Sequence, residues 1–304
     1  MQRSIAAVIV TLDPDRAALA ALLSAVAEQV TSIVIVDNSG PGRAIGAVPE
    51  GSWRARCSLI PVGRNVGLAA AQNEGIGRAL GAGASHVLLL DQDSIPAPGM
   101  TDCLARALES EAEAGRRCAA AGPRYVDEQT QSEARFVQFG RLTVRRVSCS
   151  EGGTGLVPAD LLIASGMLIP AAVLRDVGAM DESLFVDHVD TDWCLRARAK
   201  GYSVLGVCAA RMSHRLGEKP ARRILGRQFF VRTALRHYFI VRNSVLLYRR
   251  AYAPLRWVLG DAIKLSMMLV AIPIFCTPRW QHLAAIARGL LDGLRGRSGP
   301  APRA

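Results

Sequence analysis

Two acidic residues with a spacing suited to metal binding stand directly after an apolar run of the chain. Asp91 and Asp93 flank Gln92 and follow the sequence HVLLL of residues 86–90. Carboxylates two positions apart in an extended turn can share one cleft. Hard oxygen ligands of this kind hold Mg²⁺ or Mn²⁺ through one or two carboxylates and leave the other positions to substrate phosphates. The pattern therefore predicts a divalent-metal site at Asp91 and Asp93.

A second group of acids lies in the sequence FVDHVDTDWCLR of residues 185–196. Asp187, Asp190 and Asp192 precede or open a segment that reads as a helix ending near Lys200. Capping and the helix dipole call for one acid at such a place, and three exceed that need. A carboxylate held there could serve as a general base towards a sugar hydroxyl.

Two more groups suit the same site. His214 follows the strand-like residues 203–208, and a neutral imidazole can complete a metal site begun by two carboxylates. Asp37, in the sequence VDNSG, could accept a hydrogen bond from the N3–H of a pyrimidine ring. The turn of residues 64–67 opens a helix whose N-terminus could face a diphosphate. The alternative for this turn is a helix entry with a packing glycine.

The elements that must position these residues alternate between strand and helix. Near-continuous apolar strands separated by helices predict a mainly parallel sheet covered on both faces, with ligands bound outside the carboxyl ends of its strands. Asp13, Asp37 and Asp91 each follow one of these strands, although acids are also common in turns. The expected strands are 5–11, 32–36, 58–62, 86–90 and 118–122, and the expected helices are 15–29, 66–80 and 98–114.

The remainder of the chain mixes short elements and then turns basic. Residues 136–147 have hairpin character, and residues 151–158 form a glycine-rich segment that we expect to be a loop. Residues 1–210 carry a net charge of −4, whereas residues 211–304 hold 18 basic and 3 acidic residues, a net charge of +15. This asymmetry predicts a polyanion or an anionic membrane surface as partner. A solvated basic face is the alternative.

The basic region also raises the question of a membrane. The uncharged run of residues 265–278 is shorter than the ~20 residues that a spanning helix needs. Residues 279–295 are amphipathic, which favours a helix lying on a membrane surface. Packing onto the domain or onto a dimer partner is equally compatible with the pattern. The stripe consists of Trp280, Leu283, Ala287, Leu290 and Leu294.

The seven cysteines are odd in number and never form a CxxC pair. This pattern disfavours a disulfide framework or a zinc cluster and predicts reduced thiols in a cytosolic setting. The N-terminal apolar run is short and lacks a cleavage site, so we expect no secretory signal.

Taken together and in this order, these motifs resemble the family-2 inverting glycosyltransferases of the GT-A fold, and specifically their bacterial rhamnosyltransferase branch. The resemblance covers about residues 5–250. It is carried by VTLDP (10–14), IVDNSG (35–40), NVGLAAAQNEGI (65–76), LLLDQDS (88–94), SGMLIPAAVLRDVGAMDESLF (165–185), FVDHVDTDWCLRARAKGY (185–202) and SHRLGE (213–218).

The resemblance implies a role for each matching residue. Asp190 would be the catalytic base, with Asp187 and Asp192 as the alternative bases. The metal ligands would be Asp91, Asp93 and His214. Ser165, Gly166 and Trp193 would lie on the acceptor side. Many members have Asn in place of Asp13 and Glu in place of Val189. The sequence VDTDW of residues 189–193 resembles that of the rhamnosyl branch. The nucleotide sugar would contact Thr11, Asp13, Asp37, Asn65, Gly67, Asn73, Asp91, Gln92 and Asp93.

The function implied is metal-dependent, inverting transfer of L-rhamnose from dTDP-β-L-rhamnose to a saccharide hydroxyl, with Mg²⁺ or Mn²⁺ as cofactor. The acceptor would be lipid-linked, in O-antigen or other surface-polysaccharide synthesis at the inner face of the bacterial plasma membrane, and a homodimer is compatible with the sequence. Residues 1–220 would form the catalytic domain, with a nucleotide-sugar half (1–125) and an acceptor half (126–220). Residues 221–304 would form a basic helical extension.

Three alternatives stay open on the sequence. Another donor, such as a galactofuranosyl or glucosyl nucleotide, would use the same fold and acids. A dinucleotide-binding oxidoreductase is disfavoured because no GxGxxG follows the first strand. A nucleic-acid-binding module at residues 222–250, with Phe229, Tyr238 and Tyr248 among its arginines, is disfavoured because it matches no recognised binding motif.

Overall fold

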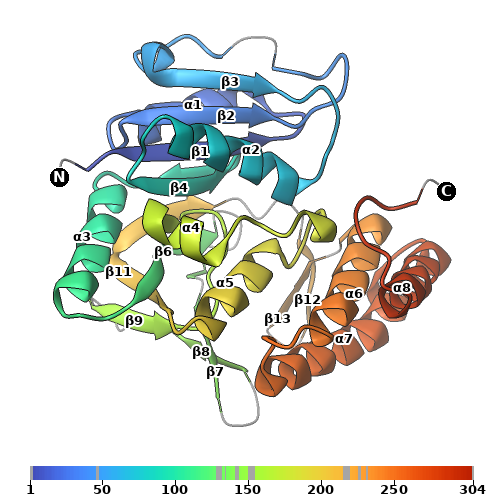
Figure 1. Ribbon diagram of the computed structural model, residues 1–304. Helices are drawn as coiled ribbons and strands as arrows, with labels where there is room; N and C mark the ends of the chain where they lie inside the picture. Colours follow the sequence, from blue (N-terminus) through green and yellow to red (C-terminus); the bar gives the residue numbers. More distant parts are fainter. Residues whose placement is uncertain are drawn as a thin grey trace.

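The fold is seen in a computed structural model that describes residues 3–45, 48–127, 132–133, 135–140, 144–149, 155–214, 220–224, 227–230 and 232–302. Within these residues one central sheet has the strand order β3-β2-β1-β4-β10-β6-β11-β5, with β9 paired to β11 (Figure 1). Its strands are β1 Ile5–Thr11, β2 Ser32–Asp37, β3 Cys57–Pro61, β4 His86–Asp91, β5 Ser94–Pro96, β6 Cys118–Asp127, β9 Leu156–Ala159, β10 Leu168–Pro170 and β11 Ser203–His214.

The long strands run parallel, which confirms the prediction of a mainly parallel sheet. Strands β3, β2, β1 and β4 are parallel neighbours, and β6 pairs with β11 in the same sense. The short strand β10 runs antiparallel between β4 and β6, and β5 and β9 run antiparallel to β11. Strand β9 lies within the expected loop of residues 151–158, so the loop prediction is wrong for residues 156–158. Residues 151–154 lie outside the described residues.

Helices cover both faces of the sheet because alternate strand residues point to opposite sides. Ile5, Ala7 and Ile9 of β1 pack with α1 and α3, whereas Ala6 and Val8 pack with α2, α4 and α5. This gives the three-layer arrangement seen in Figure 1. The helices are α1 Arg16–Ala27, α2 Leu68–Gly81, α3 Met100–Glu113, α4 Ala171–Val177 and α5 Val189–Ala199, with short 3-10 turns at Arg54–Arg56 and Glu182–Leu184.

Three helices follow at one end of the molecule, and two hairpins lie beside them (Figure 1). The predicted hairpin of residues 136–147 is confirmed as β7 and β8. Helix α8 lies directly on α6, because Gly289 and Gly293 let the backbones approach. A Cβ atom at Gly289 would stand 2.5 Å from the carbonyl oxygen of Tyr238. The elements are β7 Phe136–Phe139, β8 Val144–Val147, β12 Pro220–Ile224, β13 Arg227–Phe230, α6 Ala234–Tyr248, α7 Leu255–Phe275 and α8 Arg279–Leu294.

The apolar stripe predicted on residues 279–295 remains mostly outside this packing. Trp280 is 82% exposed, and Leu290 and Leu294 are also exposed, whereas Leu283 packs against a small core shared with α6 and α7. The neighbouring face of α8, with buried Ile286, packs in the same small core. Among the described residues no helix combines the length and the apolar character needed to cross a membrane.

The expectation that every cysteine is a reduced thiol is wrong for two of them. Cys149 and Cys208 form a disulfide, although 59 positions separate them. The fold brings the end of β8 beside β11, so that the two Cα atoms lie 5.8 Å apart, within the range that a disulfide needs. The spacing of these two cysteines in the sequence gives no indication that they approach each other. Cys57, Cys103, Cys118, Cys194 and Cys276 are free.

Candidate active site

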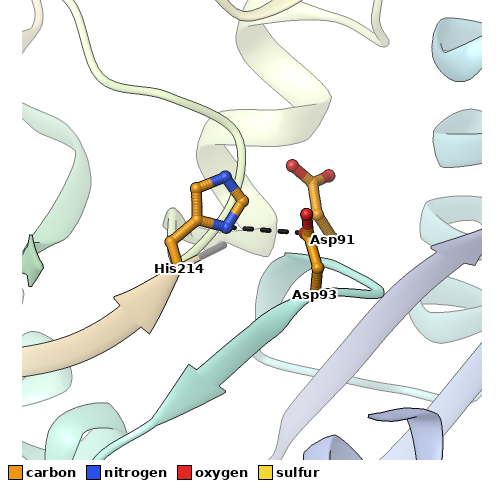
Figure 2. Close-up of side chains that lie close together, drawn as sticks. All are labelled: Asp91, Asp93 and His214. Atoms are coloured by element: carbon orange, nitrogen blue, oxygen red, sulfur yellow. Dashed lines mark ion pairs between the residues drawn. The ribbon is translucent and has the colours of Figure 1, made fainter. Parts of the chain in front are cut away.

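Asp91, Asp93 and His214 come together at one edge of the sheet. Asp91 ends β4, Asp93 lies in the turn before β5, and His214 ends β11. The antiparallel pairing of β11 with β5 places His214 opposite Ser94, next to Asp93. One ligand atom from each of the three side chains lies within 4.8 Å of the others, and His214 Nδ1 is 3.5 Å from Asp93 Oδ1 (Figure 2). The predicted metal ligands therefore form one cluster.

Two buried serines support this cluster from behind. The Ser94 hydroxyl lies 2.8 Å from His214 Nδ1 and 2.5 Å from the Ser165 hydroxyl. The Ser165 hydroxyl also accepts a hydrogen bond from the backbone N–H of Asp91, at 3.1 Å. Gly166 follows with φ +85, where a Cβ atom would collide with Pro123. Ser165 thus lies directly beside the metal cluster, and its place on the acceptor side stays a prediction.

The electrostatics of the cluster suit a cation. Removal from water raises the pKa of Asp91 to about 6; the His214 imidazole opposes this, and the charges of Asp93 and Asp190 add to it. The negative charges of the two carboxylates repel each other at this separation, and a divalent ion relieves that repulsion. Oxygen ligands with one imidazole are the donor set of Mg²⁺ and Mn²⁺ sites. The residues present therefore fit a divalent metal.

Asp190 lies in the first turn of α5, as predicted, and its carboxylate is held by backbone groups. Its Oδ1 accepts from the N–H of Thr191 at 2.6 Å, and its Oδ2 accepts from the N–H of Ala164 at 3.3 Å. Desolvation nevertheless raises the pKa of Asp190. Together with Ser165 it lines a cavity of about 250 Å³. A carboxylate with a raised pKa in a cavity wall is suited to general-base work near neutral pH.

The two alternative bases already have partners. Asp192 is fully buried; its Oδ2 accepts from Arg196 Nε at 2.8 Å and its Oδ1 accepts from the hydroxyl of Tyr252. Asp187 forms an ion pair with Arg236, with Nη2 and Oδ1 3.1 Å apart. Asp190 differs from both, because within the described part of the chain its carboxylate accepts from neutral N–H and O–H donors of Ala164 and Thr191.

The residues expected to contact the nucleotide lie at the carboxyl ends of β1, β2 and β4 and are tied to one another. Buried Asp37 accepts from the N–H groups of Ser39 and Ile45, at 3.1 and 2.7 Å, and from the hydroxyl of Thr11 at 3.4 Å. The Gln92 amide exchanges two hydrogen bonds with the backbone of Leu12, at 2.7 and 3.2 Å. These hydrogen bonds fix the carboxyl ends of β1, β2 and β4 relative to one another, beside the metal cluster.

Three further expected residues brace helix α2. Asn65 Oδ1 accepts from the N–H of Gly67 at 2.9 Å, and Gly67 has φ +92 with the ring of Phe185 packed where a Cβ atom would be. The first N–H groups of α2 donate to the carbonyl of Phe185, at 2.6 and 3.3 Å. The helix entry with a packing glycine, rather than an open anion site, is therefore what the structure shows. Asn73 holds the backbone of Met180.

Two other expected residues occupy contrasting positions. Asp13, at φ 47, is partly exposed and paired with Arg43 at 2.8 Å. Trp193 is fully buried, and its indole N–H donates to the carbonyl of Gly178 at 3.0 Å, so it packs in the core beneath the site.

The aromatic residues of the nucleic-acid-binding alternative are engaged elsewhere. Tyr238 and Tyr248 hydrogen-bond to Asp292 and Asp261 inside the helical region, so their rings are not presented as stacking surfaces for bases.

The loop that leads into Asp190 has a strained backbone. Phe185, Asp187 and His188 have φ of +65, +60 and +63, values that L-residues rarely adopt. Such outliers persist where the surroundings hold them, and they gather at functional sites. The strain here stands immediately before the first turn of α5.

Three buried polar residues of α6 hold this loop, and the sequence analysis did not identify them. The Asn243 amide lies within 2.7 to 2.9 Å of the carbonyls of Leu184, Val186 and Asp187. Arg242 Nη2 donates to the carbonyl of Leu184, and Ser244 contacts His188. The only sequence signal is a polar triplet, RNS, inside the apolar run YFIVRNSVLLY.

Comparisons with known proteins agree with this geometry. The family model described as "Glycosyl transferase family 2" matches residues 7–149. The dTDP-rhamnosyl transferase RfbF of Shigella flexneri is 30% identical over 300 residues, 98% of each chain.

Solved structures show the fold. GalNAc-T7, in a crystal structure with UDP, GalNAc and Mn²⁺, is 15% identical with a TM-score of 0.56; the match covers 73% of this chain but only 44% of GalNAc-T7. S. aureus TarS 1–349 is 11% identical with a TM-score of 0.53, over 96% of this chain and 82% of that one. The expected GT-A-like fold is thus confirmed, and the chain belongs to glycosyltransferase family 2.

Proposed function

We propose that this glycosyltransferase moves L-rhamnose from dTDP-β-L-rhamnose to a hydroxyl of a saccharide acceptor, with inversion at the anomeric carbon. The observation that carries the mechanism is the meeting of Asp91, Asp93 and His214 with Asp190, which lies close enough to raise the pKa of Asp91. The donor is proposed because the curated relative, matched along nearly the whole chain, is named a dTDP-rhamnosyl transferase.

In this mechanism each described group has one task. Asp190 takes the proton of the acceptor hydroxyl as its oxygen forms a bond to the anomeric carbon. The bond from that carbon to the diphosphate oxygen breaks, and its electron pair leaves with the nucleotide diphosphate. Asp91, Asp93 and His214 would hold Mg²⁺ or Mn²⁺, which when bound neutralises the charge of the diphosphate as a Lewis acid.

The remaining site residues are assigned by their places around this centre. Thr11, Asp13, Asp37, Asn65, Gly67, Asn73 and Gln92 would form or support the nucleotide-sugar pocket at the sheet edge, within residues 1–125. Ser165 and Gly166 would lie on the acceptor side, within residues 126–220, with Trp193 supporting that side from the core. The bonds that fix Asp37 and Gln92 to neighbouring strand ends support a preformed pocket.

The acceptor is proposed to be a lipid-linked saccharide at the inner face of the plasma membrane, in O-antigen or related surface-polysaccharide synthesis. The basic helical region of residues 221–304, with its net charge of +15 from residue 211 onward, supports attachment to an anionic surface. A homodimer at that surface is compatible with the same proposal.

The test is turnover of a panel of nucleotide sugars by the purified full chain with Mg²⁺ or Mn²⁺, scored as release of the nucleotide diphosphate. We expect dTDP-rhamnose to be consumed and Asp93→Asn to lose this activity. Asp102→Asn, a surface acid on α3 paired with Arg3, is the matched control and should retain it. Consumption of a galactofuranosyl or glucosyl nucleotide instead would contradict the donor while leaving the transferase reaction intact.

A further inference from the structure

Helix α7 presents a continuous apolar face to solvent. Its six outward side chains are spaced three or four residues apart, so they form one stripe. Each is between 44% and 69% exposed, more than a helix face packed in a core would be. The opposite side of α7 carries buried Trp257 and Asp261. The stripe consists of Leu255, Leu259, Ile263, Met267, Val270 and Ile274.

The exposed charged side chains of residues 255–302 are all cationic. Between residues 255 and 302 the acids are Asp261 and Asp292, and both are buried. The cationic side chains of the same segment are all exposed. An exposed apolar stripe flanked by cations is the pattern of a helix that lies in the interface of an anionic bilayer. The cations are Arg256, Lys264, Arg279, Arg288, Arg295 and Arg297.

A large cavity connects this face with the active site. It measures about 850 Å³ and lies between the β7–β8 hairpin, the start of α5 and α7. Arg135, Arg146 and Thr191 line both this cavity and the smaller one that contains Asp190, so the two adjoin. At its other side the wall is formed by Ile263 and Met267 of the α7 stripe.

The chemistry of the cavity wall changes along this path. Asp190 lines the smaller cavity, and Arg135 and Arg146 line both cavities. Lys264 lines the larger cavity together with the apolar side chains of Ile263 and Met267. Asp261 lies 3.6 Å from Lys264 and offsets one of these charges, so the wall keeps a positive balance. An amphiphile with an anionic group between a polar head and an apolar chain matches this order.

We propose that the larger cavity is the acceptor site and that the α7 stripe lies in the surface of an anionic bilayer. A lipid-linked acceptor then enters from the bilayer with its apolar chain along α7. Its phosphate linker binds Arg135, Arg146 and Lys264, and its sugar hydroxyl reaches Asp190. This inference rests on the proposed transfer to a lipid-linked saccharide. A second copy of the chain fits the face less well, because two such surfaces would bring like charges together.

Vesicle binding tests the stripe. Full-length protein is sedimented with vesicles of phosphatidylcholine and phosphatidylglycerol, and with phosphatidylcholine alone. We expect binding to the anionic vesicles that weakens with salt, and a loss of about tenfold or more in Ile263→Glu/Met267→Glu. The matched control, Leu290→Glu/Leu294→Glu on the exposed face of α8, should bind like the wild type. Circular dichroism confirms that both variants are folded.

The opposite pattern overturns the inference. If the α8 variant loses vesicle binding while the α7 variant keeps it, α8 is the membrane face. If the wild type binds no vesicles and the α7 variant dissociates a dimer in size-exclusion chromatography, a second copy covers the stripe.

A soluble amphiphile tests the cavity. We expect dodecyl phosphate to bind the wild type in calorimetry and dodecyl maltoside to bind more weakly. Arg146→Ala should weaken dodecyl phosphate binding about tenfold, whereas Arg145→Ala, the exposed neighbour outside the cavity wall, should not. Equal losses in both variants, or none, would contradict the site. Turnover of dTDP-rhamnose by the wild type is measured separately, so that failure of the donor assignment is distinguished from failure of this surface.

Discussion

Environment, rather than residue type, separates the roles of the acids near the start of α5. Asp192 is neutralised by Arg196 inside the core, and Asp187 is neutralised by Arg236. Asp190 is bound by N–H groups of Ala164 and Thr191, which orient the carboxylate without a full positive charge. A carboxylate paired with arginine is a weak base, whereas one held by neutral donors and removed from water is a stronger one. The assignment of Asp190 follows from these contacts.

Replacement of Asp190 by Asn tests this assignment. We expect kcat to fall by about 10²-fold or more, because the acceptor hydroxyl loses its proton acceptor, while the fold is retained. Steady-state kinetics with circular dichroism gives both readouts. Asp187→Asn is the matched variant, three residues away on the same loop, and should keep most of the activity. A large loss in Asp187→Asn with turnover retained in Asp190→Asn would move the base to Asp187.

Replacement of Ser94 by Ala tests whether the Ser94 hydroxyl contributes to metal binding. Its hydroxyl contacts His214 Nδ1 and fixes how that ring is oriented. Groups behind metal ligands typically contribute about 10–100-fold to metal affinity. We expect Ser94→Ala to raise the Mn²⁺ concentration for half-saturation by about that factor, measured directly by electron paramagnetic resonance. Ser110→Ala, on the surface of α3, should leave Mn²⁺ binding unchanged. Unaltered affinity in Ser94→Ala would mean that the hydroxyl does not orient a metal ligand.

At the scale of elements, α6 acts as a clamp on the loop before α5. The Asn243 amide nitrogen, with two N–H donors, lies within hydrogen-bond distance of three carbonyls of a backbone whose positive φ values are costly on their own. The Phe185 carbonyl of this loop also accepts hydrogen bonds from the first N–H groups of α2, so α2, α5 and α6 share one strained segment. The helical region after residue 232 therefore contributes to the geometry of the catalytic half.

Removing the Asn243 amide should disturb both stability and chemistry. Asn243→Ala leaves buried carbonyls without a donor, which costs about 1–3 kcal/mol of unfolding free energy per unsatisfied group. We expect a lower thermal midpoint, and a fall in kcat that exceeds any change in the KM for the donor, because Asp190 loses its position. Leu235→Ala, an exposed residue of the same helix, is the control for both measurements. If the Asn243→Ala protein is destabilised but keeps the wild-type kcat, the contacts of Asn243 with this loop have a structural role and do not position Asp190.

The sequence predicted the long elements and the residues at their ends, and missed what depends on contacts between distant segments. The apolar composition of residues 5–11 and 86–90 predicts buried strands, so Asp91 could be placed at a sheet edge from the sequence. Strands β5 and β10 are three residues long, too short to show any pattern, yet β5 is what brings His214 to Asp93. The Arg236–Asp187 ion pair and the Asn243 clamp join residues 49 and 56 to 59 positions apart, which periodicity cannot reveal.

The contact between α6 and α8 should be sensitive to pH. His237 and His282 are buried with their Nδ1 atoms 2.9 Å apart, and burial lowers the pKa of His237 to about 4. In the unfolded chain the pKa is about 6.5. Stability is therefore complete above about pH 6.5 and falls as the pH drops from there towards 4, by up to about 1.4 kcal/mol per pH unit. The positive charge of Arg232 acts in the same direction, and Asp187 opposes it.

Urea denaturation at about pH 7.5 and about pH 5 measures this loss. The His237→Phe variant should lose less stability between the two pH values than the wild type, because it removes the group that the folded state keeps neutral. His188 and the carboxylates titrate in both proteins, so the difference between them isolates His237. Identical pH dependence in the two proteins would contradict the assignment.

At the scale of the whole molecule, the disulfide joins the parts that enclose the substrate path. Cys149 follows β8 and Cys208 lies in β11, so the bond fastens the hairpin that lines both cavities to the central sheet. A loop of 59 residues closed in this way gains roughly 4 kcal/mol in the chain-entropy model. A reducing cytosol would keep the bond open, and the proposed site of action, the inner face of the plasma membrane, is exposed to that cytosol. The redox state of this pair therefore matters for both stability and location.

Thiol counting decides between the two states. In denaturant without reductant we expect five reactive thiols, and seven after reduction, because the free cysteines are Cys57, Cys103, Cys118, Cys194 and Cys276. Reduction, or Cys208→Ser, should lower the thermal midpoint, since the hairpin loses its covalent link to β11. Cys103→Ser, a free and partly exposed cysteine of α3, should not. If protein purified from a reducing cytosol shows seven thiols and the same midpoint before and after reductant, the hairpin is held by noncovalent packing and the enzyme can work where glutathione keeps the pair open.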